Sequence, residues 1–191
     1  MSPPQSATRS KLLAAAEQIL VQRGITGLSV RKVGDVAGLN PTLVTYHFGS
    51  LGTLLEKVRD RNLEPILAAW EGLDQLGGLD DILRGWLGSL LMEAAFTAGG
   101  RALVVIDEIS SHAEGGLGAA VIAASSPFSR KLRALLLPLC PELDEAEMRA
   151  RIRFISAAAL GPPPRGRRMV GVSKEEELEY LVRFAHAALR R

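Results

Sequence analysis

Polar side chains of a kind suited to nucleic-acid binding gather in one short stretch of the sequence, AGLNPTLVTYHFGSLGTLL at residues 37–55. The stretch holds Asn40, Thr42, Thr45 and Tyr46. Their hydroxyl and amide groups can hydrogen-bond to phosphate oxygens or to the edges of bases. The two threonines are small enough to approach a base closely, and their methyl groups can contact the methyl of thymine. These residue types indicate binding to DNA.

A second set of reactive side chains lies in DEISSH, at residues 107–112. Glu108 and His112 are four residues apart, so on a helix they would share one face and could hold a metal ion together with a third ligand. No further cluster of histidine or cysteine accompanies them, and the G-x-S-x-G motif of a serine nucleophile is absent. We therefore expect no metal site, no cofactor and no enzymatic activity.

Two short helical segments flank the turn in the first stretch. Ser29 can cap a helix that ends at Gly38, where a residue without Cβ permits a tight turn. Asn40 can cap the next helix, which runs to about His47, with Pro41 at the first helical position. Two short helices joined in this way form a helix-turn-helix, whose second helix can lie in the major groove of DNA.

Charge is distributed in keeping with that expectation. Residues 1–62 hold eight lysines and arginines against four acidic residues, whereas the remainder holds fifteen against seventeen. A basic N-terminal third suggests a segment that faces a polyanion. Arg31 and Lys32, early in the helix before the turn, can reach the flanking groove and the phosphate backbone.

The rest of the chain predicts an all-α protein, with a small head followed by a larger helical bundle. Apolar residues recur three and four positions apart in most segments, and capping residues precede several of them. Beyond the two short helices, we expect helices at 8–24, from Ser50 with a kink or a new start at Pro65, at 79–98, 101–112, 126–137, 144–160 and from Ser173 to the C-terminus. We expect a DNA-binding domain at residues 1–49 and a sensing and dimerisation domain at residues 50–191.

The segment GITGLSVRKVGDVAGLNPTLVTYHFGSLGTLL resembles the TetR family of bacterial transcription regulators, over about Leu12 to Val58. Shared features are a glycine, Ser-x-Arg, Ala-Gly before an aliphatic residue, and Tyr-His-Phe before a Leu-Leu helix. The resemblance implies an N-terminal helix-turn-helix and a C-terminal bundle that dimerises. It also implies a DNA-facing surface at Ser29, Arg31, Asn40, Pro41, Thr42, Thr45, Tyr46 and His47, and we add Lys32 from its position.

The sequence also departs from the family pattern at three places. The family often has a glycine where Thr42 stands, a tyrosine where Thr45 stands, and a lysine where Leu51 stands. That lysine usually touches phosphate. Base preference is therefore not transferable from other family members.

The last two helical segments are apolar over a wide arc, which indicates that each buries two faces. In TetR-like proteins the second face packs against the same helices of a twin subunit, so we expect a homodimer that binds a palindromic operator. The alternative is that the last helix is simply central to its own bundle. We assign the dimer interface to one stripe on each helix, formed by Met148, Ile152, Ile155, Ala159, Leu178, Leu181, Val182, Ala185 and Leu189.

The resemblance further implies a small-molecule effector, of unknown identity, within the C-terminal bundle. Aromatic, acidic and apolar residues that could line its site are Trp70, Trp86, Met92, Phe96, Asp107, Glu108, His112, Phe128 and Phe154. We thus expect a ligand-responsive regulator, and a repressor in particular. The alternative is a helical protein-interaction or architectural DNA-binding protein without an effector, and a ligand-sized cavity would separate the two.

Composition excludes several other classes. A single cysteine, Cys140, cannot form an internal disulfide. The N-terminus is polar, and no uninterrupted apolar stretch approaches the roughly 18–20 residues that cross a bilayer. We expect a cytoplasmic protein without a membrane partner.

Overall fold

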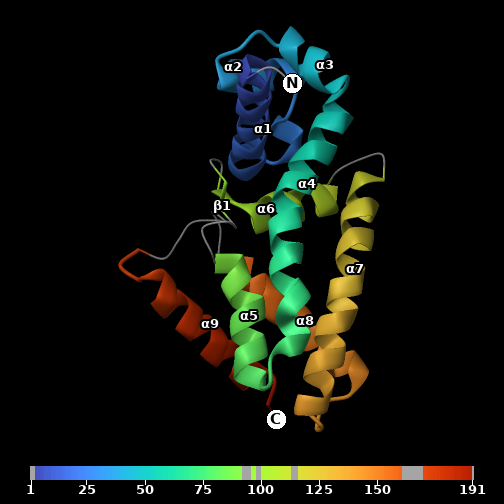
Figure 1. The fold of residues 1–191 in the computed structure, drawn as a ribbon, viewed down its shortest axis with the longest axis vertical. Helices are drawn as coiled ribbons and strands as arrows, with labels where there is room; N and C mark the ends of the chain where they lie inside the picture. Colours follow the sequence, from blue (N-terminus) through green and yellow to red (C-terminus); the bar gives the residue numbers. More distant parts are fainter. Residues whose placement is uncertain (1–2, 92–95, 98–99, 113–115, 161–169, 191) are drawn as a thin grey trace. The chain divides into compact units, whose positions relative to one another are not determined.

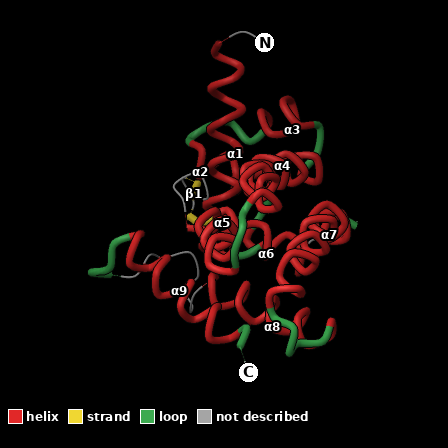
Figure 2. Tube along the Cα trace, turned by 60° about the horizontal axis from the view of Figure 1, so that its bottom comes forward, coloured by secondary structure: helices red, strands yellow, loops and turns green. Residues whose placement is uncertain are grey.

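The computed structural model describes residues 3–91, 96–97, 100–112, 116–160 and 170–190. Within these ranges the regular structure is helical apart from two short antiparallel strands, β1 (Phe96–Thr97) and β2 (Gly100–Arg101) (Figure 2). The α-helices are α1 (Pro3–Arg23), α2 (Val30–Ala37), α3 (Thr42–Phe48), α4 (Leu51–Trp70), α5 (Leu79–Leu91), α6 (Ala102–His112), α7 (Leu117–Leu136), α8 (Glu145–Leu160) and α9 (Lys174–Ala188). Short 3-10 turns, η1 (Ile25–Gly27), η2 (Glu71–Gln75) and η4 (Leu137–Leu139), lie between them. The predicted all-α class is confirmed.

The chain divides into two compact units. The first unit comprises residues 1–64 and 96–122, and the second comprises residues 65–95 and 123–191. Helix α6 therefore belongs to the same unit as the helix-turn-helix. The functional division at residues 49 and 50 remains a prediction.

In the first unit, α1 packs on α2, and α2 packs on α3 (Figure 1). The apolar positions that recur along α1 are buried, as their spacing predicts. Side chains of the following helices complete the core. Its buried members in the N-terminal helices include Leu12, Ala16, Ile19, Leu20, Val33, Val44, Phe48, Leu54 and Val58. This core fixes the orientation of the two helices of the motif.

A buried polar contact joins α1 to α4 in the same unit. The carboxylate of Glu17 is fully buried, and its Oε1 accepts a hydrogen bond from Asn62 Nδ2 at 2.8 Å. The guanidinium of Arg61 lies 3.5 Å from the same oxygen. A buried carboxylate is tolerated when a cation and a hydrogen-bond donor face it, so this contact fixes how α4 leaves the head.

In the second unit, α5 packs chiefly against α9, and α8 also packs on α9. Arg84 of α5 forms a two-pronged ion pair with the carboxylate of Glu179 on α9. This contact lowers the pKa of Glu179, because the hydrogen bond and charge of Arg84 stabilise the ionised form. Arg151 of α8 donates to the carbonyls of Ala188 and Arg190, at 2.8 and 2.7 Å, and so closes the C-terminal end of α9.

Several expected boundaries are wrong. α1 begins at Pro3, five residues before the expected cap at Thr8. α4 continues through Pro65, and α7 begins at Leu117 and continues through Pro127, although each proline removes a backbone donor from its helix. The helix expected at residues 79–98 is also wrong, because Phe96 and Thr97 form a strand.

Candidate nucleic-acid interface

The polar beginning of α2 lies at the surface of the first unit. Ser29 caps the helix as predicted, since its Oγ accepts a hydrogen bond from the backbone N–H of Lys32 at 3.2 Å. Arg31 is exposed and Lys32 is half-buried, while Val33 is fully buried. Burial of Val33 thus holds α2 in place and leaves the two cations beside the turn.

A close backbone contact fixes the angle between α2 and α3. Gly38 takes the left-handed conformation, with φ of 64°, which glycine adopts without a Cβ clash. Gly34, one turn earlier, lies against the residue before α3: a Cβ added there would lie 2.8 Å from Pro41 Cα and 2.9 Å from Pro41 N. The two helices approach this closely only because residue 34 is glycine. Our sequence reasoning did not single out Gly34, although a glycine inside a short helix is a signal of close approach.

The cap of α3 involves two of the predicted DNA-binding residues. Asn40 Oδ1 accepts hydrogen bonds from the backbone N–H of Thr42 at 2.9 Å and from its hydroxyl at 2.8 Å. The helix begins at Thr42, one residue later than predicted, after Pro41 with φ of −55°. Because the Thr42 hydroxyl donates to Asn40, its methyl group and oxygen lone pairs remain available to a base or phosphate.

The two sides of α3 differ sharply in exposure. Val44 and Phe48 are buried, whereas Thr45 is exposed and Tyr46 is 71% exposed. The half-buried ring of His47 packs edge-on against Tyr46, with ring centroids 5.0 Å apart. A tyrosine this exposed on a rigid, capped helix can offer its hydroxyl to a phosphate oxygen. Of the predicted set, Ser29, Arg31, Asn40, Thr42, Thr45 and Tyr46 are exposed, and Lys32, Pro41 and His47 are half-buried.

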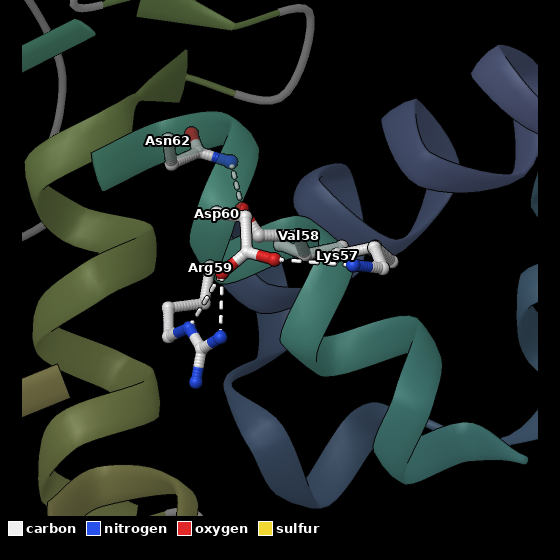
Figure 3. Close-up of polar contacts among 5 residues, drawn as sticks. All are labelled: Lys57, Val58, Arg59, Asp60 and Asn62. Carbon is white, nitrogen blue, oxygen red and sulfur yellow. Dashed lines mark hydrogen bonds and ion pairs between the residues drawn. The ribbon is translucent and has the colours of Figure 1, made fainter. Parts of the chain in front are cut away.

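The cations of α4 are engaged with acidic side chains (Figure 3). Asp60 accepts hydrogen bonds from Arg59 Nε at 2.9 Å and from Lys57 Nζ at 3.4 Å. Burial raises the pKa of the Asp60 carboxyl, but the hydrogen bonds and charges of Arg59 and Lys57 outweigh this and hold it below its usual value. Lys57 is therefore less available to DNA than its sequence position suggests.

The predicted effector residues fall into several different environments. In the second unit, Trp86 is buried, and Trp70 donates from Nε1 to Ser89 Oγ at 2.7 Å. The rings of Trp70 and Phe128 lie 6.2 Å apart, so these two do come together. Phe154 lies at the surface, where it is 63% exposed.

The other members of that set lie elsewhere or cannot be described. Met92 is outside the described residues, and Phe96 is in strand β1. Asp107 is half-buried, and His112 is exposed. The effector assignment of the set as a whole stays a prediction.

Glu108 has a structural contact that the sequence did not suggest. Its Oε1 accepts a hydrogen bond from the backbone N–H of Ile25 at 2.7 Å, across 83 positions of sequence. Its Oε2 lies 3.5 Å from Nδ1 of His112. The first N–H groups of the η1 turn have no partner within the turn, and the carboxylate of Glu108 accepts from one of them. Glu108 thus attaches the segment between α1 and α2 to α6.

Replacing Glu108 with alanine is therefore expected to loosen this link. Loss of a hydrogen bond to a charged acceptor should cost about 1–3 kcal/mol of local stability. Hydrogen exchange of the Ile25 amide should then be faster than in the wild type. The Glu108→Gln variant keeps an acceptor and should retain much of the protection, and Ser111→Ala, at an exposed site on α6, should leave it unchanged. Unaltered Ile25 exchange in Glu108→Ala would show that the contact does not hold the turn.

Two hollows in the second unit lie on either side of Arg84. One, of about 340 Å³, is lined by α5 and the first turns of α9 and includes Gly88 and Leu178. The other, of about 350 Å³, includes His186 and Arg190. Both volumes fall at the lower end of the range for small-molecule sites. Among the residues that the structure describes, the lining of neither hollow includes a member of the predicted effector set.

The predicted dimer interface needs a correction, because most of its residues are buried within this chain. Met148, Ile155, Ala159, Val182, Ala185 and Leu189 are at most 3% exposed, while Ile152, Leu178 and Leu181 are half-buried. The second apolar stripe of the same helices faces outward instead. Phe154, Tyr180 and Phe184 are 63%, 47% and 50% exposed. The outward face of α8 and α9 is thus the aromatic one, and we call these three residues the aromatic stripe.

The described residues also bear on membrane and metal-binding functions. No helix there is long and apolar enough to cross a membrane. The described histidine, cysteine, aspartate and glutamate side chains form no group of three or more that could hold a metal ion. Cys140 is buried, and burial raises the pKa of its thiol, so it is a poor nucleophile.

Comparison with known proteins finds one family model that resembles the N-terminal part of the chain. The model for "bacterial regulatory proteins, tetR family" matches residues 12–58, which include α2, α3 and the start of α4. No curated protein sequence matches the chain at a significant level.

Solved structures resemble the chain over nearly its whole length. A member of the TetR transcriptional regulator family from Streptomyces coelicolor has a TM-score of 0.71 at 19% identity, over 94% of this chain and 91% of that one. The TetR-family regulator PfmR from Thermus thermophilus has a TM-score of 0.66 at 18% identity, over 93% of both chains. A putative TetR-family regulator from a Rhodococcus species has a TM-score of 0.64 at 20% identity, over 96% and 99%. At such identities the likeness shows the fold.

The resemblance predicted from the sequence is thereby confirmed, and it is to a family of transcriptional regulators and not of enzymes. Residues 12–58 thus resemble the TetR family of bacterial regulatory proteins, and the fold of the whole chain resembles that of solved TetR-family regulators.

Proposed function

We propose that the protein is a ligand-responsive repressor that binds a palindromic operator as a homodimer. One observation carries the proposal. α3 exposes Thr45 and Tyr46, while its start is held by the hydrogen bond to Asn40 and its inner face is buried in the core. A recognition helix needs both properties, because side chains must reach the groove while the backbone stays rigid.

The surface that we assign to DNA is the set Ser29, Arg31, Lys32, Asn40, Pro41, Thr42, Thr45, Tyr46 and His47. Arg31, Lys32 and Tyr46 are suited to phosphate oxygens, which position the protein. Thr42 and Thr45 are suited to base edges, and a thymine methyl is a fitting partner for either. We assign this role to residues 1–49, with sensing and dimerisation in residues 50–191.

Dimerisation in this proposal uses the aromatic stripe on α8 and α9. Large aromatic side chains that lie exposed at the surface of helices mark interaction surfaces. Two copies related by a two-fold axis would bury the same stripe from each subunit and set the two recognition helices at a fixed separation.

An effector would act by binding more tightly to one of two arrangements of the dimer, the one that binds the operator less well. The coupling expected for such regulators is about 1–3 kcal/mol. The two hollows beside Arg84 are open to the surface and are of a size that admits a small molecule, which is compatible with a sensor.

The DNA-binding proposal is tested by replacing both Thr45 and Tyr46 with alanine. The wild-type protein would first be used to select a duplex from a randomised library, and a two-fold symmetric site is the expected product. The double variant should bind the selected duplex at least about tenfold more weakly, because each lost contact is worth about 1–3 kcal/mol. Mobility-shift titration measures the affinity, and circular dichroism confirms that the helices remain.

The Ser10→Ala variant serves as control, since Ser10 is exposed on α1 and outside the assigned surface. Equal affinity of wild type and double variant for the selected duplex would contradict the assignment of α3. Failure of the wild type to enrich any duplex would contradict DNA binding altogether.

A further inference from the structure

The recognition helix and its flanks contain no lysine and no arginine. Residues 40–56 hold neither residue, and the cations nearest in sequence are Lys32 before them and Lys57 after them. Affinity for DNA nevertheless comes largely from cations that neutralise phosphates. The charge that holds the C-terminal end of α3 on DNA must therefore come from another element of the fold.

The nearby cations of α4 are poorly placed to supply that charge. Lys57 and Arg59 both pair with Asp60, and Arg61 pairs with the buried carboxylate of Glu17. The carboxylate beside each of these three cations already neutralises part of its charge. Arg31 lies on α2, at the other end of the motif from the last residue of α3.

Arg9 of α1 supplies a cation at that place. Its guanidinium carbon lies 5.1 Å from the centroid of the Phe48 ring, within the range of a cation–π contact. Phe48 is the last residue of α3 and is two positions after the exposed Tyr46. Arg9 is half-buried, and the ion pairs of the described residues do not include it. The aromatic ring thus holds the guanidinium in position without neutralising its charge.

We propose that Arg9 binds a DNA phosphate at the C-terminal end of α3, an inference that rests on the proposed function. The guanidinium is planar and carries donors on several edges, so one edge can face a phosphate while its face stays on Phe48. α1 thereby contributes to the interface through a tertiary contact. A sequence pattern does not reveal this contact, because 39 positions separate the two residues.

The test uses Arg9→Met, which keeps an apolar stem over Phe48 and removes the charge. The probe is a mixed-sequence DNA duplex, because a phosphate contact does not depend on base sequence. Affinity would be measured over a series of salt concentrations. We expect the slope of log affinity against log salt to fall by about 0.9 for each subunit bound, with an affinity roughly tenfold lower at low salt.

Two variants serve as controls. Arg9→Lys keeps a cation and should restore most of the slope. Lys11→Met removes a charge from an exposed position on the same helix, away from Phe48, and should change the slope much less. Thermal unfolding of Arg9→Met would show whether the variant remains folded. A smaller folded fraction would lower the apparent affinity at every salt concentration without changing the slope.

The possible outcomes separate this inference from the function on which it rests. A wild-type slope in Arg9→Met, with or without weaker binding, would overturn the phosphate contact and leave DNA binding by α3 intact. A wild-type protein that does not bind the duplex would overturn both proposals together. A reduced slope that Arg9→Lys restores supports the assignment.

Discussion

Replacing Phe184 with glutamate is expected to separate the proposed dimer into monomers and to reduce operator affinity by about 10²–10⁴. Phe184 is 50% exposed on α9, so the substitution should leave the subunit folded and place a charge within the aromatic stripe. A buried, unpaired carboxylate at each copy of a two-fold interface costs several kcal/mol. A monomer binds only one half-site of the operator. It therefore lacks the high effective concentration with which the second subunit of a dimer binds once the first subunit is bound.

Sedimentation velocity would measure the mass of the variant, and mobility-shift titration its affinity. Val170→Glu is the matched control, because Val170 is a fully exposed apolar residue of the same unit and lies outside α8 and α9. It should leave the dimer unchanged. Val182→Glu, by contrast, should unfold the second unit, since Val182 is only 2% exposed. An intact dimer for Phe184→Glu would place the interface on another surface.

Replacing Gly34 with alanine is expected to destabilise the helix-turn-helix by about 1–3 kcal/mol, as overpacking of a close contact does. The added Cβ would meet backbone atoms of Pro41 at 2.8 and 2.9 Å, and backbone cannot rotate away as a flexible side chain can. α3 must shift outward, so Tyr46 and Thr45 should lose their register with the groove. Thermal unfolding followed by circular dichroism measures the first effect, and affinity for the selected duplex measures the second.

Gly52→Ala provides the matched substitution within the same unit. Its Cβ would lie 3.6 Å from Ser50 Oγ, an ordinary contact, and alanine favours the helix by up to about 1 kcal/mol over glycine. This variant should be as stable as the wild type or more stable. If Gly34→Ala were equally stable and bound DNA equally well, the close approach of α2 and α3 would not be a requirement of the site.

Local features of the fold were predictable from the sequence, because capping depends on residues within one turn. Ser29, Asn40 and Ser50 each accept the backbone hydrogen bond that their positions predicted. Ser173, the expected start of the last helix, forms a capping box with Glu176, and these hydrogen bonds lower the pKa of that glutamate. Such contacts need no knowledge of the tertiary fold.

Features that depend on distant packing were not predictable in the same way. The two apolar stripes of α9 are nearly equivalent in sequence, yet Val182 is buried and Phe184 is exposed. The packing of α5 and α8 on α9 decides between them. The sequence predicts a helix start at Ser126-Pro127, because proline is unfavourable inside a helix, but a longer helix runs through it.

The candidate site shows the same division. The resemblance supplied the surface of α2 and α3, since those residues are adjacent in sequence. Glu108 was grouped with effector residues, because its neighbours in sequence gave no indication of Ile25, which it contacts across 83 positions. Gly34 and Arg9 became visible only through contacts with Pro41 and Phe48.

An uncharged reading helix has a consequence for how such a regulator could acquire new target genes. Residues 40–55 contain no charged residue apart from His47, so substitutions among them alter base preference without altering the number of phosphates neutralised. Non-specific binding, which lets a protein slide along DNA, comes largely from that electrostatic term. Evolution could therefore redirect this protein to another promoter while the speed of its search along DNA stayed the same.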